Sequence, residues 1–129
     1  MQLFVTAPYG AALAVLFIVL TQLVIITRNR AKVALGDGGD PQLIEAIRRQ
    51  VNFVENVPLA LILMLLAEAG GAGATVLNAT GLALVAARLI HPFGITMANA
   101  AHPLRIAGAV ATNGIMIVLI VLIAMQYFA

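Results

Sequence analysis

Four long runs of apolar residues, separated by short polar connections, make up most of this chain. They cover about residues 9–27, 41–69, 74–91 and 105–128, the second with a polar beginning. At a rise of 1.5 Å per residue, roughly 20 such residues cross a hydrocarbon core of about 30 Å. The pattern predicts an all-α integral membrane four-helix bundle, with one domain over residues 1–129.

The composition supports a chain surrounded by membrane lipid. Of its 129 residues, 63% are hydrophobic and 9% are charged. A soluble domain is nearer half apolar and a quarter charged. The chain has no cysteine and only two histidines, far apart, so we expect neither a catalytic thiol nor a metal site.

The basic residues predict how the helices are oriented. All seven lie at or near the first and third connections: Arg28, Arg30, Lys32, Arg48, Arg49, Arg88 and Arg105. The positive-inside rule then places these two connections in the cytoplasm and both termini outside. The flank "MQLFVTAP" has no lysine or arginine, which favours a first spanning helix over a cleaved signal peptide. Membrane orientation accounts for the excess of basic residues, so no nucleic-acid partner is expected.

The second helix has clear start and stop signals. Asp40 and Pro41 suit the N-cap and the first helical position, and Gly70 and Gly71 suit the end. A helix over 41–69 would be roughly 43 Å long, longer than the apolar core. Its first two turns are therefore expected to stand in the cytoplasm.

A polar stripe lies at the beginning of this helix. Glu45, Arg48, Asn52 and Glu55 follow one another at spacings of three, four and three, which puts them on one helix face. Intramembrane charges usually face the bundle interior or a cavity. The stripe is either a salt-bridge network between Arg48 and Glu55 or a polar pocket for a charged ligand.

Further arginines favour the pocket. The third helix ends with Arg88 and His91, one turn apart, and the fourth begins with Arg105. Three arginines from three helices would thus meet in one cytoplasmic layer with few carboxylates to pair with them. Guanidinium groups bind carboxylates in a bidentate manner, so an organic acid suits this layer.

The segment "IRRQVNFVENVPLAL" resembles the signature of the MAPEG family, the membrane-associated proteins in eicosanoid and glutathione metabolism. That signature is an arginine, an asparagine four later, a glutamate three after that and a proline three further on, matched by Arg48, Asn52, Glu55 and Pro58. The segments "LGDGGDPQLIEAIR" and "ARLIHPFG…LRIAG" are similar to the bacterial branch of the family. The resemblance covers essentially the whole chain.

The resemblance implies a homotrimer in a bacterial inner membrane, and the termini that the positive-inside rule places outside are then periplasmic. It implies glutathione as co-substrate, bound between subunits near the cytoplasmic face. Arg48, Asn52 and Glu55 would hold the charged ends of the tripeptide, arginine its carboxylates and glutamate its amine. Arg28 or Arg30, at the end of the first helix, would add a carboxylate contact.

Two later arginines also match the family. Arg88 matches an arginine at the end of the third helix, and Arg105 matches the fourth-helix arginine that faces the thiol. A guanidinium does not act as a base at neutral pH, but it stabilises a thiolate. His91 stands where eukaryotic relatives carry tyrosine, and either ligand binding or capping of the loop fits it. Hydrophobic electrophiles or lipid peroxides are therefore expected as substrates, rather than fatty-acid derivatives.

Two other functions stay open from the sequence. Small four-helix drug exporters are of similar size, but they carry a glutamate in the first helix, which here is uncharged. A family member that binds a ligand without catalysis would share most of these residues. The Arg105→Ala variant separates catalysis from binding, because it should abolish turnover and leave much of the glutathione binding.

Overall fold

The computed structural model describes residues 4–129, and this part of the chain is helical apart from its connections. The elements in order are α1 (Thr6–Ala31), α2 (Pro41–Ala69), α3 (Ala74–Ile90), the short 3-10 helix η1 (His91–Gly94) and α4 (Pro103–Phe128). Four helical segments are long and apolar enough to cross a membrane, the third being α3 together with η1. The predicted all-α fold with four potential spanning helices is confirmed, whereas the homotrimer stays a prediction.

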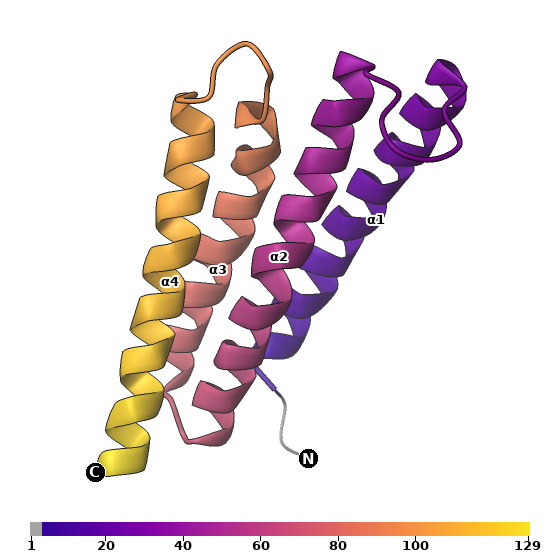
Figure 1. Cartoon of the computed structure of the whole chain (residues 1–129). Coiled ribbons are helices and arrows are strands. Elements are labelled where there is room, and N and C mark those ends of the chain that lie inside the picture. The colour runs from indigo at the N-terminus through magenta and orange to yellow at the C-terminus, as the bar shows by residue number, and fades with distance from the viewer. Residues whose placement is uncertain (1–3) are drawn as a thin grey trace.

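The helices lie side by side, and their connections define two different ends (Figure 1). The α1–α2 and α3–α4 connections lie together at one end, while α1 begins and α4 ends at the other. Helix α1 packs mainly on α2, α3 packs on α4, and α2 also contacts α4. We call the end with the two longer connections the loop end.

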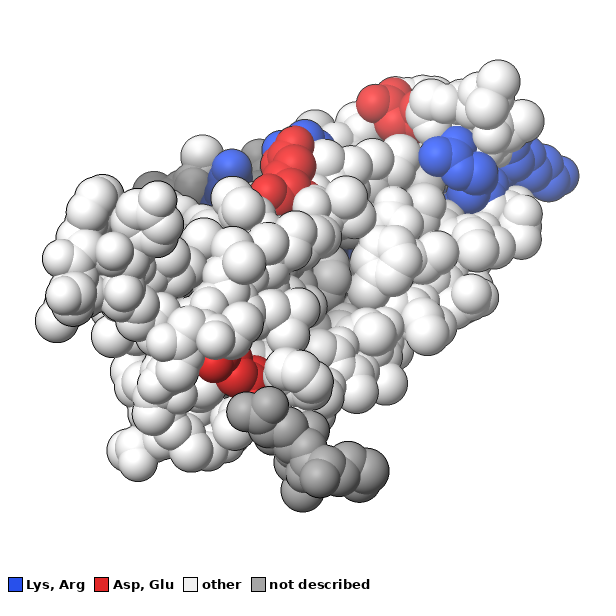
Figure 2. Space-filling model, turned by 90° about the horizontal axis from the view of Figure 1, so that it is seen from below, with Lys and Arg blue, Asp and Glu red and all other residues white. Residues whose placement is uncertain are grey.

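The core of the bundle is apolar and draws on all four helices. Its most buried side chains are Leu13, Leu20, Val57, Ala60, Met64, Ala67, Leu77, Leu84 and Leu119. Many large apolar side chains instead face outwards: Ile26, Leu82 and Ile117 are each more than half exposed. The face seen in Figure 2 is mostly uncharged, with a few separate charged groups. Such an apolar exterior suits hydrocarbon rather than water.

Helix α2 begins where the sequence predicts. The side chain of Asp40 accepts a hydrogen bond of 2.9 Å from the backbone N–H of Leu43, and Pro41 is the first helical residue. This bond satisfies one of the backbone donors that a helix N-terminus leaves unpaired. The helix ends at Ala69, followed by Gly70.

Helices α1 and α4 begin earlier than the apolar runs suggest. Helix α1 begins at Thr6 because Glu68, from the end of α2, takes the place of a capping residue. The Glu68 carboxylate accepts from the Thr6 N–H at 2.9 Å, from the Thr6 hydroxyl at 2.6 Å and from the Val5 N–H. Helix α4 begins at Pro103, because the His102 side chain accepts from the Leu104 N–H at 3.2 Å.

Candidate functional site

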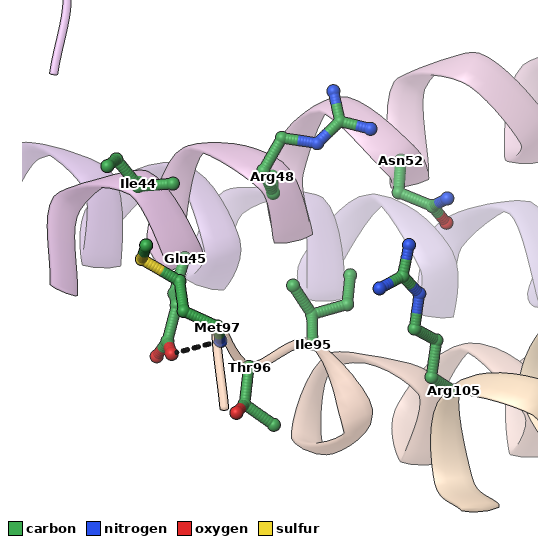
Figure 3. Close-up of a pocket in the computed structure, with 8 residues that line it drawn as sticks. All are labelled: Ile44, Glu45, Arg48, Asn52, Ile95, Thr96, Met97 and Arg105. Atoms are coloured by element: carbon green, nitrogen blue, oxygen red, sulfur yellow. Dashed lines mark hydrogen bonds between the residues drawn. The ribbon is translucent and has the colours of Figure 1, made fainter. Parts of the chain in front are cut away.

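A small pocket opens at the loop end, between the beginning of α2, the connection after η1 and the beginning of α4 (Figure 3). Its volume is about 110 Å³. Eight residues line it: Ile44, Glu45, Arg48, Asn52, Ile95, Thr96, Met97 and Arg105. Three segments that are far apart in the sequence thus meet around one partly polar space.

Two arginines at this pocket have no acidic partner in the described part of the chain. Arg48 and Arg105 are both exposed, and neither takes part in a salt bridge or a side-chain hydrogen bond among residues 4–129. The guanidinium group of Arg105 points towards α2, where Arg48 and Asn52 lie (Figure 3). The salt bridge between Arg48 and Glu55, the alternative to a ligand pocket, is absent from this part of the chain. The pocket therefore carries positive charge that is available to an anion.

Arg88 lies behind the pocket rather than in it. Its side chain is only 2% exposed, and one terminal nitrogen donates to Oδ1 of Asn52 at 2.6 Å. The other lies 3.5 Å from the hydroxyl of Thr112, and the guanidinium carbon lies 6.0 Å from the centre of the Phe53 ring. Since a guanidinium has only donors, this bond fixes the amide of Asn52 with its oxygen towards Arg88. The Asn52 NH₂ group is left to serve the pocket as a donor.

His91 is also buried, and it does not line the pocket. It was expected to be the last residue of the third helix, but α3 ends at Ile90 and His91 begins η1. It is 2% exposed, and its Nδ1 has no hydrogen-bond partner within residues 4–129. The side chain packs against Gly108 of α4, where an added Cβ would stand 2.7 Å from the His91 Cβ. His91 thus mediates the contact between η1 and α4.

Three other predicted ligand residues lie away from the pocket. Glu55 is exposed and is not among the residues that line it. Arg28 donates to the carbonyl oxygens of Val33 and Gly36, at 3.1 and 2.7 Å. Arg30 forms a salt bridge of 2.9 Å with Asp40. In a single chain, both arginines therefore organise the α1–α2 connection.

Two residues with a clear structural role at the site were not singled out for it from the sequence. Glu45 and Arg49, one turn apart on α2, bind the backbone that follows α3. Arg49 donates to the carbonyl oxygens of Pro92 and Ile95, at 2.9 and 3.0 Å, and Glu45 accepts from the Met97 N–H at 2.8 Å. The only available signal was their four-residue spacing, which is typical of a pair on one helix face. Within residues 4–129, no group of acidic, histidine or cysteine side chains could hold a metal ion.

The fold and the site define a polytopic membrane protein with an arginine-lined pocket at one end of a four-helix bundle. Comparison with known proteins identifies the group to which it belongs. The chain matches the MAPEG family over residues 6–125 and is a member of that family. It is 39% identical over 90 residues to Inner membrane protein YecN of Escherichia coli strain K12, an alignment that covers 70% of this chain and 69% of the relative. The protein of the same name from Escherichia coli O6:H1 strain CFT073 matches equally well. Together with the four apolar helices, these findings support a multi-pass inner-membrane protein.

Proposed function

We propose that this protein is a membrane-bound glutathione transferase with peroxidase activity towards lipid peroxides. Membership of the MAPEG family supports this proposal at the level of the class. The observation that carries it is the meeting of Arg48, Asn52 and Arg105 around one pocket. Two unpaired guanidinium groups and an amide donor suit a ligand with carboxylates and an ionisable thiol.

Three residues of the pocket, together with Arg88 behind it, have proposed roles. Arg48 and the Asn52 NH₂ group bind a carboxylate of glutathione, and Arg88 holds Asn52 in the orientation that this requires. Arg105 stabilises the thiolate, because a positive neighbour lowers the pKa of a thiol from above 8 towards neutrality. The sulfur then attacks an electrophilic carbon and displaces a leaving group. With a lipid hydroperoxide, two glutathione molecules are oxidised to the disulfide, and the peroxide is reduced to an alcohol and water.

The proposal includes a homotrimer. A single chain leaves Glu55 on its outer surface, away from the pocket. Glu55 would therefore hold the amine of glutathione only where the face of a neighbouring subunit completes the site. Arg28 and Arg30 would likewise contact ligand only at a site completed by a neighbouring subunit. They would then lose part of their present contacts in the α1–α2 connection.

The proposal also includes an orientation. The basic residues predict that the loop end, and with it the pocket, faces the cytoplasm, with both termini periplasmic. Cytoplasmic glutathione would then enter from the aqueous side. Hydrophobic electrophiles would reach the site through the lipid that surrounds the apolar faces.

Titration calorimetry of glutathione into the detergent-purified protein tests the binding step. We expect saturable binding that Arg48→Ala and Glu55→Ala both weaken. No binding up to millimolar glutathione would reject glutathione as the thiol and would favour another thiol, or the transporter alternative.

Turnover with a chromogenic electrophile and with a lipid hydroperoxide tests the chemical step. Arg105→Ala is expected to abolish turnover while it keeps much of the glutathione binding. Normal turnover by Arg105→Ala would refute the mechanism. Binding by the wild type without turnover of either substrate class would instead indicate a ligand-binding family member without catalysis.

A further inference from the structure

The pair Glu45–Arg49 connects the beginning of α2 to the α3–α4 connection. Arg49 Nε donates to the Pro92 carbonyl at 2.9 Å, and Arg49 Nη2 donates to the Ile95 carbonyl at 3.0 Å. Glu45 Oε1 accepts from the Met97 N–H at 2.8 Å (Figure 3), and Glu45 Oε2 lies 3.4 Å from Arg49 Nη2. Two side chains on one turn of α2 thus bind three backbone atoms of one connection.

These contacts provide hydrogen-bond partners for backbone groups of the α3–α4 connection. The chain leaves helical geometry after Gly94: the Ile95 N–H still donates to the Pro92 carbonyl at 3.2 Å, but the Ile95 carbonyl and the Met97 N–H lie outside any helix. Such groups are costly where water is scarce. The two Arg49 contacts with the backbone are partly buried, whereas the Glu45 contact with the Met97 N–H is exposed to solvent. A planar guanidinium reaches two carbonyls at once, which a lysine does not.

The bound connection is itself a wall of the pocket. Ile95, Thr96 and Met97 line it opposite Arg48 and Asn52. The position of this wall therefore depends on two side chains of α2.

The same connection is coupled to Arg105. Gly94 lies so close to α4 that an added Cβ would stand 2.1 Å from the backbone nitrogen of Arg105. A shift of the connection would move the beginning of α4, and the guanidinium of Arg105 with it.

We propose that Glu45 and Arg49 are positioning residues, which fix the α3–α4 connection and so set the width of the pocket between Arg48 and Arg105. The expected effect on glutathione binding rests on the proposed function, whereas the claim that the two side chains fix the connection does not. Glu45 itself lines the pocket, whereas Arg49 does not, so loss of Arg49 widens the pocket without removing any residue that lines it. Binding and turnover then fall because small displacements of positioned groups weaken both.

The order of the connection is the first measurement. Because the sequence has no cysteine, a single nitroxide label can be attached through Ala98→Cys, an exposed position next to Met97. We expect Arg49→Met and Glu45→Ala to raise the mobility of this label in electron paramagnetic resonance spectra. Arg49→Lys should give a smaller rise, since one carbonyl contact remains within reach. An unchanged label in Arg49→Met would overturn the proposal.

Two controls separate a local effect from general loosening. Thr21→Val removes the 3.0 Å hydrogen bond from Gln50 of α2 to α1, near the same turn of α2, without touching the connection. It should leave the label at position 98 as in the wild type. A second label, at Leu35→Cys in the α1–α2 connection, should not respond to Arg49→Met; equal loosening there would overturn the proposal in favour of a general structural role.

Glutathione titration is the second measurement. Arg49→Met is expected to raise the Kd for glutathione about tenfold, with partial recovery in Arg49→Lys and no change in Thr21→Val. A mobile label with unchanged affinity would overturn the positioning role. If the wild type itself did not bind glutathione, the proposed function would fail, and the label alone would decide whether the pair holds the connection.

Discussion

Arg88 of α3 donates a hydrogen bond of 2.6 Å to Oδ1 of Asn52 of α2, and this bond joins a fully buried cation to the lining of the pocket. No salt bridge compensates the Arg88 charge within residues 4–129. The side-chain oxygen of Asn52 therefore stabilises the bundle by binding Arg88, while its NH₂ group remains available to the pocket.

Asn52→Leu should destabilise the bundle as well as weaken glutathione binding. Leucine cannot accept the hydrogen bond that Asn52 Oδ1 accepts from the buried Arg88 guanidinium, so the free energy of unfolding should fall by about 2 kcal/mol. The reversible unfolding of detergent-solubilised protein measures this change. The double variant Asn52→Leu/Arg88→Met should lose less than the sum of the two single variants, because the two residues share one interaction. Strict additivity would show that the bond is not a significant source of stability.

Gly108→Ala and Gly114→Ala, on the same helix, should differ in their effect on stability. A Cβ at Gly108 would stand 2.7 Å from the His91 Cβ and 3.0 Å from the Ala87 carbonyl oxygen, whereas nothing lies within 4 Å of a Cβ at Gly114. Gly108→Ala is therefore expected to lower the unfolding free energy by about 1–3 kcal/mol through overpacking. Gly114→Ala should be neutral or stabilising by up to about 1 kcal/mol, since alanine is the better helix former. Equal melting temperatures for the two variants would contradict the close packing of η1 on α4.

Glu68→Ala should loosen the beginning of α1 without affecting the pocket. The Glu68 carboxylate binds the Thr6 and Val5 N–H groups, and negative charge is favourable at a helix N-terminus. By analogy with loss of an N-cap, we expect a destabilisation of about 1 kcal/mol. Hydrogen exchange of the first turn of α1 should accelerate, while the Kd for glutathione stays that of the wild type. A changed Kd would show that the two ends of the bundle are coupled.

Acid should weaken the start of α2 through Asp40. The hydrogen bond from the Leu43 N–H, and then the charge of Arg30, hold the pKa of Asp40 below its ordinary value of 3.8. A carboxyl group whose pKa is lower in the folded state stabilises that state above pH 3.8, and this contribution disappears as the pH falls through the folded-state pKa. Asp40→Asn keeps an N-cap but does not titrate, so its melting temperature should fall less steeply in this acid range than that of the wild type. Parallel curves would assign the acid sensitivity to other groups.

The sequence predicts the helices well because their signals are local. Asp40, Pro41 and Gly71 mark the two ends of α2 by their own chemistry, and the structure confirms both ends: Asp40 caps the first turn, and Gly71 has a φ of 93° just past the last one. The early start of α1 could not be predicted in this way. Its cap is supplied by Glu68, which lies 62 residues away from Thr6 in the sequence.

The site is predictable only in part, for a related reason. Helical spacing places Arg48, Asn52 and Glu55 on one face, but it does not say where the opposite wall ends. That wall is the α3–α4 connection, which reaches Arg48 and Asn52, while Glu55 lies about one turn deeper and outside the pocket. The role of Arg49 depends on backbone atoms of Pro92 and Ile95, and no pattern of side chains reveals such contacts.

The burial of Arg88 has a consequence for how ligands are attracted. The positive charges of Arg48 and Arg105 are exposed, so salt in the medium weakens their pull on an approaching anion. The charge of Arg88 is enclosed by protein, where mobile ions do not reach it. The contribution of Arg88 to the electrostatic potential inside the pocket should therefore depend less on salt concentration than the contributions of Arg48 and Arg105.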